Sequence, residues 1–266
     1  GVDILLSGAL ILDESASMTM LSLAKMVPTA ISSLMGTVVG VFNPQITIAY
    51  AEGDKEKLVD IIKSCNRILI FIMSIPIAFL TAYGRDFYAL WQPTKDPDML
   101  QRLSLLAVGV LYVSMSIQVL YHVFIITKKV KWNSLVVLGS GICSSLLSLI
   151  LLSKTDLGVA CFPLSSMLTG VLRNMIFTPI YAARCLEIRW NRFYSDIFLG
   201  FASIGTITVL GLLSRMIVPI HSWIILLLTG VVMGPLALLV NFFVILRKQE
   251  RNMVIGMVRS RLKGEA

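Results

Sequence analysis

Charged residues are scarce in this sequence. Lysine, arginine, aspartate and glutamate make up 14% of the 266 residues, against 56% hydrophobic residues, and the mean hydropathy is +0.84. A soluble domain of this length needs a polar surface to meet water, and this composition does not supply one. The scarcity of charge therefore excludes an ordinary soluble domain and predicts that lipid is the solvent.

Residues for covalent chemistry are also few. The two histidines, His122 and His221, fall in different segments, and the four cysteines have no CxxC spacing. The sequence has no HExxH, GxSxG or GxxxxGK motif, and no apolar segment holds a pair of carboxylates. These motifs would supply a zinc site, an activated serine or a phosphate cradle. We therefore expect no enzymatic activity, no cofactor and no bound metal, with the cysteines acting as small apolar residues.

The net charge of +8 would suit a nucleic-acid partner. The basic residues, however, gather at the ends of apolar segments and form no patch interleaved with aromatic side chains. This pattern favours contact with an anionic membrane surface and excludes a nucleic-acid partner.

Seven apolar segments are long enough to cross about 30 Å of hydrocarbon at about 1.5 Å per residue. Segments in lipid must satisfy their own backbone hydrogen bonds, so we expect an all-α, polytopic membrane helix bundle. A polar loop is predicted at 84–97, and Asp54 is predicted to cap the helix that follows it. The predicted spans are 17–49, 55–83, 103–126, 133–153, 157–183, 196–214 and 223–246.

The two ends of the chain differ in character. Residues 2–12 form an apolar segment of about half the length of a span, and the chain opens at Gly1 without a signal-peptide pattern. We expect the chain to be the C-terminal part of a longer protein. The basic tail, 247–266, alternates cations with apolar residues and is interpreted either as an amphipathic helix on an anionic leaflet or as a solvated terminus.

Lysine and arginine are divided unequally between the two ends of the predicted spans. One side holds five of these residues, and the other side holds sixteen. The asymmetry predicts that the side with sixteen, and the C-terminus with it, is cytoplasmic. The five are Arg85, Lys95, Arg102, Lys154 and Arg215. The sixteen are Lys55, Lys57, Lys63, Arg67, Lys128, Lys129, Lys131, Arg184, Arg189, Arg192, Arg247, Lys248, Arg251, Arg259, Arg261 and Lys263.

Two cations, Lys25 and Arg173, lie inside predicted spans. Each is about ten residues, on the order of 15 Å, from the nearer end of its helix. A charge at that depth costs at least a few kcal/mol unless it faces water or a partner, and such residues mark transport pathways. We predict that both bind substrate, together with Asn174 beside Arg173.

Small and polar residues accompany both cations at helical spacing. The face around Lys25 holds Ser22, Thr29, Ser32, Gly36, Gly40 and Asn43, and that around Arg173 holds Ser166, Thr169, Gly170 and Phe177. These faces either line a cavity or pack against neighbouring helices, because small residues at this spacing are also a common packing device. Gln118 and His122, one turn apart, are candidates to extend the same lining. Prolines such as Pro28 and Pro179 are expected to kink their helices.

The stretch Phe42–Leu58, FNPQITIAYAEGDKEKL, resembles the end of the eighth helix and the following cytoplasmic connection in polysaccharide flippases. These are the O-antigen repeat-unit translocases of the multidrug/oligosaccharidyl-lipid/polysaccharide exporter superfamily. Further similarity lies in Ser22–Lys25, in Ile75-Pro76, in Gly84–Phe87 and in Leu90-Trp91. The resemblance covers about the first two hundred residues.

The resemblance implies a MATE-like architecture of two six-helix lobes around a central cavity that opens alternately to either side. Residues 1–195 would form the second lobe, from the end of helix seven to helix twelve. Residues 196–246 would add two transmembrane helices, and 247–266 a basic cytoplasmic tail, with the first lobe absent. The fragment alone is then expected not to transport.

The function implied by the resemblance is to flip a polyprenyl-diphosphate-linked oligosaccharide across the cytoplasmic membrane for polysaccharide or lipopolysaccharide biosynthesis. Lys25 and Arg173 would hold the diphosphate, and an ion gradient would reset the carrier. The implied partners are the lipid-linked oligosaccharide, membrane lipids and the missing first lobe.

Two alternatives remain open. A multidrug or cation antiporter of the same superfamily would use an acidic coupling residue in a span, and here Asp3 and Asp196 lie only near helix ends. An integral-membrane glycosyltransferase or ligase would concentrate polar residues in a large outer loop. The longest outer loop predicted, 84–101, holds no evident base or nucleophile.

Overall fold

In a computed structural model, which describes residues 14–246 and Arg251, the chain folds into a bundle of helices, and these residues contain no strand. Six helical stretches are long and apolar enough to cross a membrane, which confirms the predicted polytopic helix bundle. The apolar segment at 2–12 and the tail, apart from Arg251, lie outside the described residues. The elements are α2 (Glu14–Ala51), α3 (Lys55–Trp91), α4 (Pro97–Ser114), α5 (Leu120–Ile126), α6 (Val130–Lys154), η1 (Gly158–Ala160), α7 (Cys161–Leu172), η2 (Arg173–Phe177), α8 (Thr178–Cys185), α9 (Tyr194–Ile217) and α10 (Trp223–Val244).

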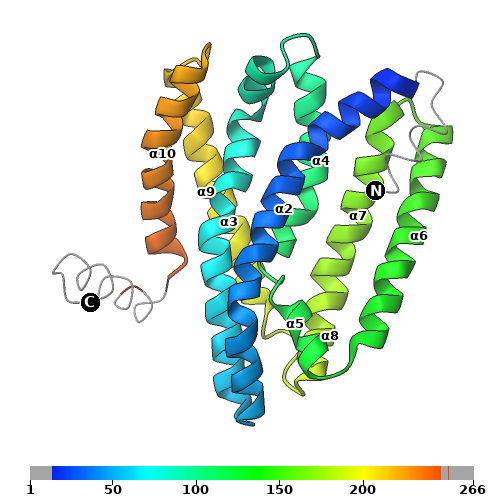
Figure 1. Ribbon diagram of the computed structural model, residues 1–266, viewed down its shortest axis with the longest axis vertical. Coiled ribbons are helices and arrows are strands. Elements are labelled where there is room, and N and C mark those ends of the chain that lie inside the picture. Colours follow the sequence, from blue (N-terminus) through cyan, green and yellow to red (C-terminus); the bar gives the residue numbers. More distant parts are fainter. Residues whose placement is uncertain (1–13, 247–250, 252–266) are drawn as a thin grey trace.

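The connections between helices alternate between the two ends of the bundle. Figure 1 shows the links from α2 to α3, from α5 to α6 and from α8 to α9 at the lower end, and the links from α3 to α4, from α6 to α7 and from α9 to α10 at the upper end. The lower links carry basic residues that belong to the group of sixteen. The fold therefore has the alternating connections on which the count of lysine and arginine was based. We call the lower end the basic end.

The α2–α3 link is short and well capped. Gly53 adopts a positive φ of +80°, and Asp54 accepts a hydrogen bond from the backbone N–H of Lys57 at 3.1 Å. A side-chain acceptor here satisfies one of the helix's unpaired N–H groups. The predicted cap at Asp54 is confirmed.

The predicted loop at 84–97 is wrong over its first half, because α3 stays helical to Trp91. The two charges in that half, Arg85 and Asp86, form ion pairs with neighbouring helices. Arg85 Nε lies 2.7 Å from Asp98 Oδ1, and Asp86 Oδ2 lies 2.8 Å from Arg215 Nε. Gly84 also allows the side chain of Gln101 to approach so closely that a Cβ would lie 2.0 Å from its Oε1.

The predicted span 103–126 is not one helix. It breaks into α4 and α5 at a buried turn, residues 115–119, in which hydrogen bonds run from residue i to i−3, as from Ser116 N to Val113 O. The turn packs against α9 at Gly200, where a Cβ would lie 2.2 Å from Ser116 Oγ. Close packing of a third helix, which no local pattern encodes, therefore explains the break.

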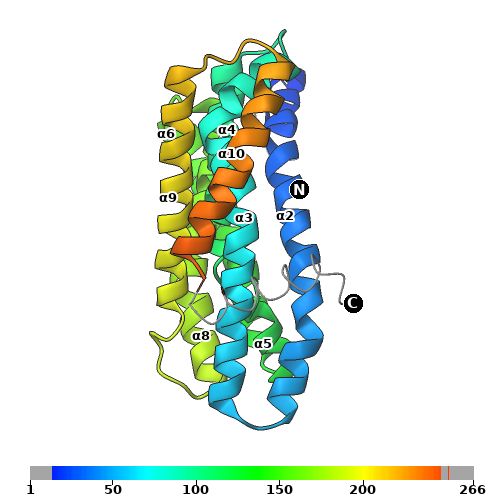
Figure 2. The ribbon, with the colours of Figure 1, turned by 90° about the vertical axis from the view of Figure 1, so that its left-hand side faces the viewer.

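α3 is the central helix of the bundle and packs against α2, α4, α9 and α10 (Figures 1 and 2). The helices of the predicted additional pair, α9 and α10, both pack on it, and Asn241 of α10 donates from its Nδ2 to Phe71 O and Ser74 Oγ at 3.0 and 2.8 Å. In contrast, α6 packs mainly on α7, and most of its side chains are exposed. Such apolar, exposed helices suit a lipid surround.

Candidate functional site

Arg173 lies in the middle of the helical stretch Gly158–Cys185, twelve residues from Cys161 and from Cys185, which is about 18 Å of helical rise. The segment Arg173–Phe177 is a π-helical turn, with the N–H of Thr178 donating to Arg173 O. Single π turns are rare and concentrate at functional sites. Pro179, just beyond it, lacks an N–H and displaces the preceding turn, which accounts for the irregularity.

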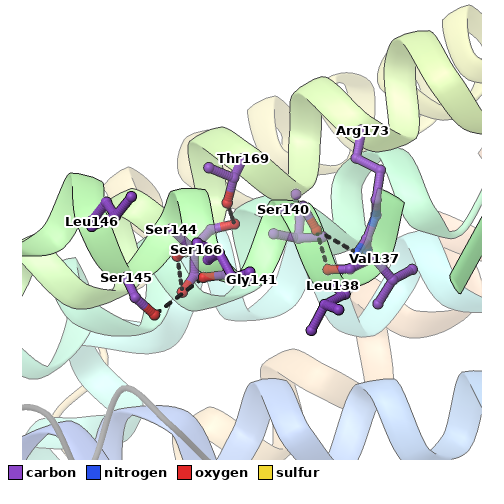
Figure 3. A pocket seen from close by; sticks show the side chains of 13 residues that line it. Val137, Leu138, Ser140, Gly141, Ser144, Ser145, Leu146, Ser166, Thr169 and Arg173 are labelled. Atoms are coloured by element: carbon purple, nitrogen blue, oxygen red, sulfur yellow. Dashed lines mark hydrogen bonds between the residues drawn. The ribbon is translucent and has the colours of Figure 1, made fainter. Parts of the chain in front are cut away.

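The Arg173 side chain projects from this turn across a cavity toward α6. Its Nη1 donates to Ser140 Oγ at 3.2 Å and its Nε to Asn174 Oδ1 at 3.4 Å. Figure 3 shows the side chain reaching over the pocket toward Ser140. The guanidinium is thus aimed by two neutral acceptors, which leaves its charge available to an anion.

The cavity beside Arg173 has a volume of about 760 Å³ and lies between α6 and α7. Its walls carry a row of hydroxyl groups and two glycines, Gly141 and Gly170 (Figure 3). The hydroxyls donate mostly to helix carbonyls or to one another, so they can still accept further hydrogen bonds. They belong to Ser140, Ser144, Ser145, Ser166 and Thr169.

Lys25 lines a second cavity, of about 340 Å³, between α2, α4 and α7. This cavity shares Val110 and Ser166 with the cavity beside Arg173, so the two adjoin. The structure therefore places the two predicted cations on a pair of adjoining cavities. We call this pair the cationic hollow.

The position of Lys25 on α2 is set by a kink. Pro28 has no N–H, so the carbonyl of Ala24, one residue before Lys25, loses its helical partner. The hydroxyl of Tyr88 on α3 lies 3.3 Å from this carbonyl oxygen, and it lies 3.0 Å from Ser104 Oγ on α4. Three helices thus meet at the turn that carries Lys25.

Asn174 is not on the cavity surface but behind it, with 1% of its surface exposed. Its Oδ1 accepts from the hydroxyl of Tyr121 at 2.8 Å, and its Nδ2 donates to Ser114 Oγ at 2.7 Å. Since Oδ1 also faces Arg173 Nε, the amide positions the guanidinium from the core side.

His122 lies on α5, near the basic end. Its Nε2 is 2.9 Å from Thr47 Oγ1 on α2, and the Thr47 hydroxyl also donates to Asn43 O at 2.9 Å. The His122 ring and the Thr47 hydroxyl therefore link α5 to α2. Gln118 is half-buried in the turn between α4 and α5. His122 therefore extends the polar face of α2 toward the basic end, beyond the cationic hollow.

The face of α2 between Lys25 and Thr47 is largely unpartnered within the described residues. Ser32, Ser33, Gly36, Thr37 and Gly40 are exposed, and a Cβ added to either glycine would meet no atom within 4 Å. A polar, small-residue face that spans about 30 Å of helix is poorly suited to hydrocarbon.

Sequence reasoning missed Ser140, the residue that Arg173 contacts across the cavity. Its signal was present, because serine and glycine recur on α6 at helical spacing, at 140–141, 144–145 and 148. That pattern identified a small, polar face on α6, but it did not show that this face packs against α7. Within the described residues, no cluster of three or more histidine, cysteine or acidic side chains could hold a metal ion.

Comparison with known proteins gives one informative similarity. No family model matches the chain, and no solved structure matches it. The chain is 27% identical over 255 residues to EpsK of Bacillus subtilis strain 168, a protein described as an uncharacterised membrane protein. The alignment covers 96% of this chain and 50% of EpsK, so the chain spans about half the length of the curated relative it matches.

Proposed function

We propose that the chain is the second half of a flippase that moves a polyprenyl-diphosphate-linked oligosaccharide across the cytoplasmic membrane. The observation that carries the proposal is the placement of Lys25 and Arg173 on adjoining cavities that share Val110 and Ser166. A diphosphate carries negative charge through hydrocarbon, and two cations inside the bundle offset the loss of its hydration. The similarity to a membrane protein supports a location in the membrane.

The lining of the cationic hollow fits the rest of such a substrate. Hydroxyl groups on α6 and α7 offer hydrogen bonds to sugar hydroxyls, and the exposed apolar residues Leu138, Ile142 and Leu146 stand beside them for the isoprenoid. Arg173 supplies a planar fork for two phosphate oxygens, and Lys25 supplies a point charge.

The transport cycle needs a wall opposite α2 and α6. We propose that the unpartnered face of α2 is covered by the first lobe of the same protein, in keeping with a relative about twice as long. The lobes would rock about this face, with the basic end toward the cytoplasm. The chemistry would be binding and release, with no covalent step and with an ion gradient resetting the carrier.

Genetic complementation tests the proposal. The intact protein carrying Lys25→Ala or Arg173→Ala is expressed in cells whose own flippase is deleted, and surface polysaccharide is measured at equal membrane protein levels. We expect about a tenfold loss or more, because each charge-assisted bond contributes about 1.5–3 kcal/mol. Lys154→Ala, an exposed cation at the end of α6, is the matched control and should leave the polysaccharide unchanged.

Undiminished surface polysaccharide in both variants would remove the cationic hollow from the transport path. Efflux of cationic drugs in place of polysaccharide export would identify the antiporter alternative. Sugar transfer by the purified protein would identify the enzyme alternative.

A further inference from the structure

A third cavity lies over α4 at the end opposite the basic end. It shares Leu106 and Met167 with the cavity beside Lys25, so it adjoins the cationic hollow, but its lining differs in character. It has a volume of about 950 Å³, and its walls come from α4, α7 and α9. Most of its lining is apolar, including Leu105, Met167, Val171 and Phe201. Its mouth, in contrast, is charged, with Asp96, Asp98, Arg102 and Asp156. We call it the α4 crevice.

The α4 crevice has the depth of one membrane leaflet. Its lining runs along α4 from Asp98 to Val113, which is about 22 Å of helical rise. One leaflet contributes roughly 15 Å of hydrocarbon, half of the usual core. A chain that enters at the charged mouth can therefore lie along α4 to about the middle of the bilayer. The two hydroxyls in the crevice, Thr81 and Tyr112, bond each other at 2.8 Å.

Close helix packing forms the floor of the α4 crevice. Gly109 lets α4 approach α7 so closely that a Cβ would lie 2.4 Å from Met167 Sδ. Without a side chain at 109, Met167 of α7 packs directly against the backbone of α4 and lines the crevice together with Leu105 and Tyr112. Such a surface suits a flexible acyl chain.

The charges at the mouth are not equivalent. Asp98 is occupied by Arg85, with two hydrogen bonds of 2.7 and 3.2 Å, and this guanidinium holds the pKa of Asp98 below its usual value. Asp96 caps α4 by accepting from Asp98 N at 2.9 Å. Arg102 and Asp156, both exposed, form no ion pair with any residue that the structure describes. One cation and one anion are therefore left for a ligand.

We propose that the α4 crevice binds a phospholipid whose headgroup carries a primary ammonium, from the leaflet at this end of the bundle. Arg102 holds the phosphate, Asp156 accepts hydrogen bonds from the ammonium, and an acyl chain lies along α4. A zwitterionic headgroup complements a mouth with one free charge of each sign, whereas a purely anionic lipid leaves Asp156 facing negative charge. The inference does not depend on the proposed transport function.

Lipid binding to the intact, delipidated protein in detergent tests the proposal by native mass spectrometry. The probes are phosphatidylethanolamine, its trimethylated analogue phosphatidylcholine, and phosphatidylglycerol, all with identical acyl chains. We expect phosphatidylethanolamine to bind about fivefold more tightly than phosphatidylcholine, the order of one net hydrogen bond of about 1 kcal/mol. Phosphatidylcholine keeps the phosphate and the charge but cannot donate hydrogen bonds to Asp156.

Two variants test which part of the headgroup Asp156 and Arg102 each bind. Asp156→Asn should remove the preference for phosphatidylethanolamine over phosphatidylcholine, and Arg102→Gln should weaken both lipids by about fivefold. Lys154→Gln, two residues from Asp156 and outside the crevice lining, should change neither. Equal binding of both zwitterionic lipids, a preference that survives Asp156→Asn, unchanged affinity in Arg102→Gln, or tighter binding of phosphatidylglycerol would each overturn the proposal.

Discussion

The hydroxyl of Tyr194 on α9 donates to the carbonyl oxygen of Met175, inside the π-helical turn that carries Arg173, at 2.9 Å. Met175 lies four residues before Pro179, whose missing N–H would otherwise have been the partner of this carbonyl. Tyr88 and the carbonyl of Ala24 form the same arrangement beside Lys25, with Pro28 as the cause. Both deep cations therefore sit next to a proline kink whose released carbonyl is satisfied by a tyrosine from another helix.

Replacing Tyr194 with phenylalanine removes this hydroxyl and leaves the ring in place. We expect Tyr194→Phe to lower the free energy of unfolding by about 1 kcal/mol, because a half-buried carbonyl loses its only side-chain partner among the described residues. Thermal unfolding in detergent measures the change. Tyr50→Phe, at an exposed position near the basic end, is the control. A loss no larger than in the control would show that the kink needs no cap.

Just after α5, one non-glycine residue adopts a left-handed backbone conformation, which a Cβ disfavours. Lys128 has φ +56°, and the hydrogen bonds from Lys128 N to Ile125 O and from Lys129 N to Phe124 O form a Schellman cap. Glycine is favoured at this position because it has no Cβ to clash. We expect Lys128→Gly to raise the free energy of unfolding by about 0.5–1 kcal/mol, seen as a higher thermal midpoint.

Lys131→Gly, three residues on and inside α6, is the matched control for that substitution. It removes the same charge from a helical position and should lower stability by about 1 kcal/mol. If both substitutions shift the midpoint in the same direction, the loss of charge and not the backbone conformation decides the outcome.

Gly170 keeps α7 close to α4 beside the cationic hollow. A Cβ at this position would lie 2.9 Å from Val110 Cγ2, and a β-branched valine has little freedom to move away. We expect Gly170→Ala to destabilise the protein by about 1–3 kcal/mol through overpacking. Gly139→Ala on α6, where a Cβ would meet no atom within 4 Å, should be neutral or slightly stabilising. Equal midpoints for the two variants would contradict the packing.

The pKa of Glu187 lies below its ordinary value of 4.5, first because Lys55 Nζ donates a hydrogen bond to it and then through the charge of Lys55. A carboxylate with a lowered folded-state pKa adds stability above pH 4.5 and loses it as the pH falls through the folded-state pKa. Glu187→Gln should therefore have a lower midpoint than the parent at pH 7, and the difference should shrink below pH 4.5. A difference that is constant with pH would show that the ion pair does not stabilise the contact between the start of α3 and the α8–α9 connection.

The sequence was sufficient for helices whose apolar length and flanking signals agree. Hydropathy and the capping residue Asp54 placed the start of α3. The sequence was insufficient where contact with a helix distant in the sequence determines the local structure. The break at 115–119 depends on Gly200 of α9, and the extension of α3 to Trp91 depends on the partners Asp98 and Arg215.

The same distinction holds for the candidate site. The distance of Lys25 and Arg173 from the ends of their predicted helices was enough to single them out, because a cation deep in a membrane span is costly and marks a functional site. The contact with Ser140 and the support from Asn174 depend on how α6, α7 and α4 pack, which spacing within one helix does not contain. His122 lies toward the basic end beside Thr47, and it does not line either cavity of the cationic hollow.

Binding of a polyprenyl diphosphate to the purified intact protein tests the central role of Lys25 and Arg173 most directly. Equilibrium titration with a short-chain polyprenyl diphosphate, and with the matching monophosphate, compares the parent with Lys25→Gln, Arg173→Gln and Arg173→Lys. We predict that the parent prefers the diphosphate and that each glutamine variant weakens diphosphate binding about tenfold, with Arg173→Lys intermediate because it keeps the charge and loses the planar fork. Affinities that are the same in all four proteins, or equal for the two ligands in the parent, would contradict the account.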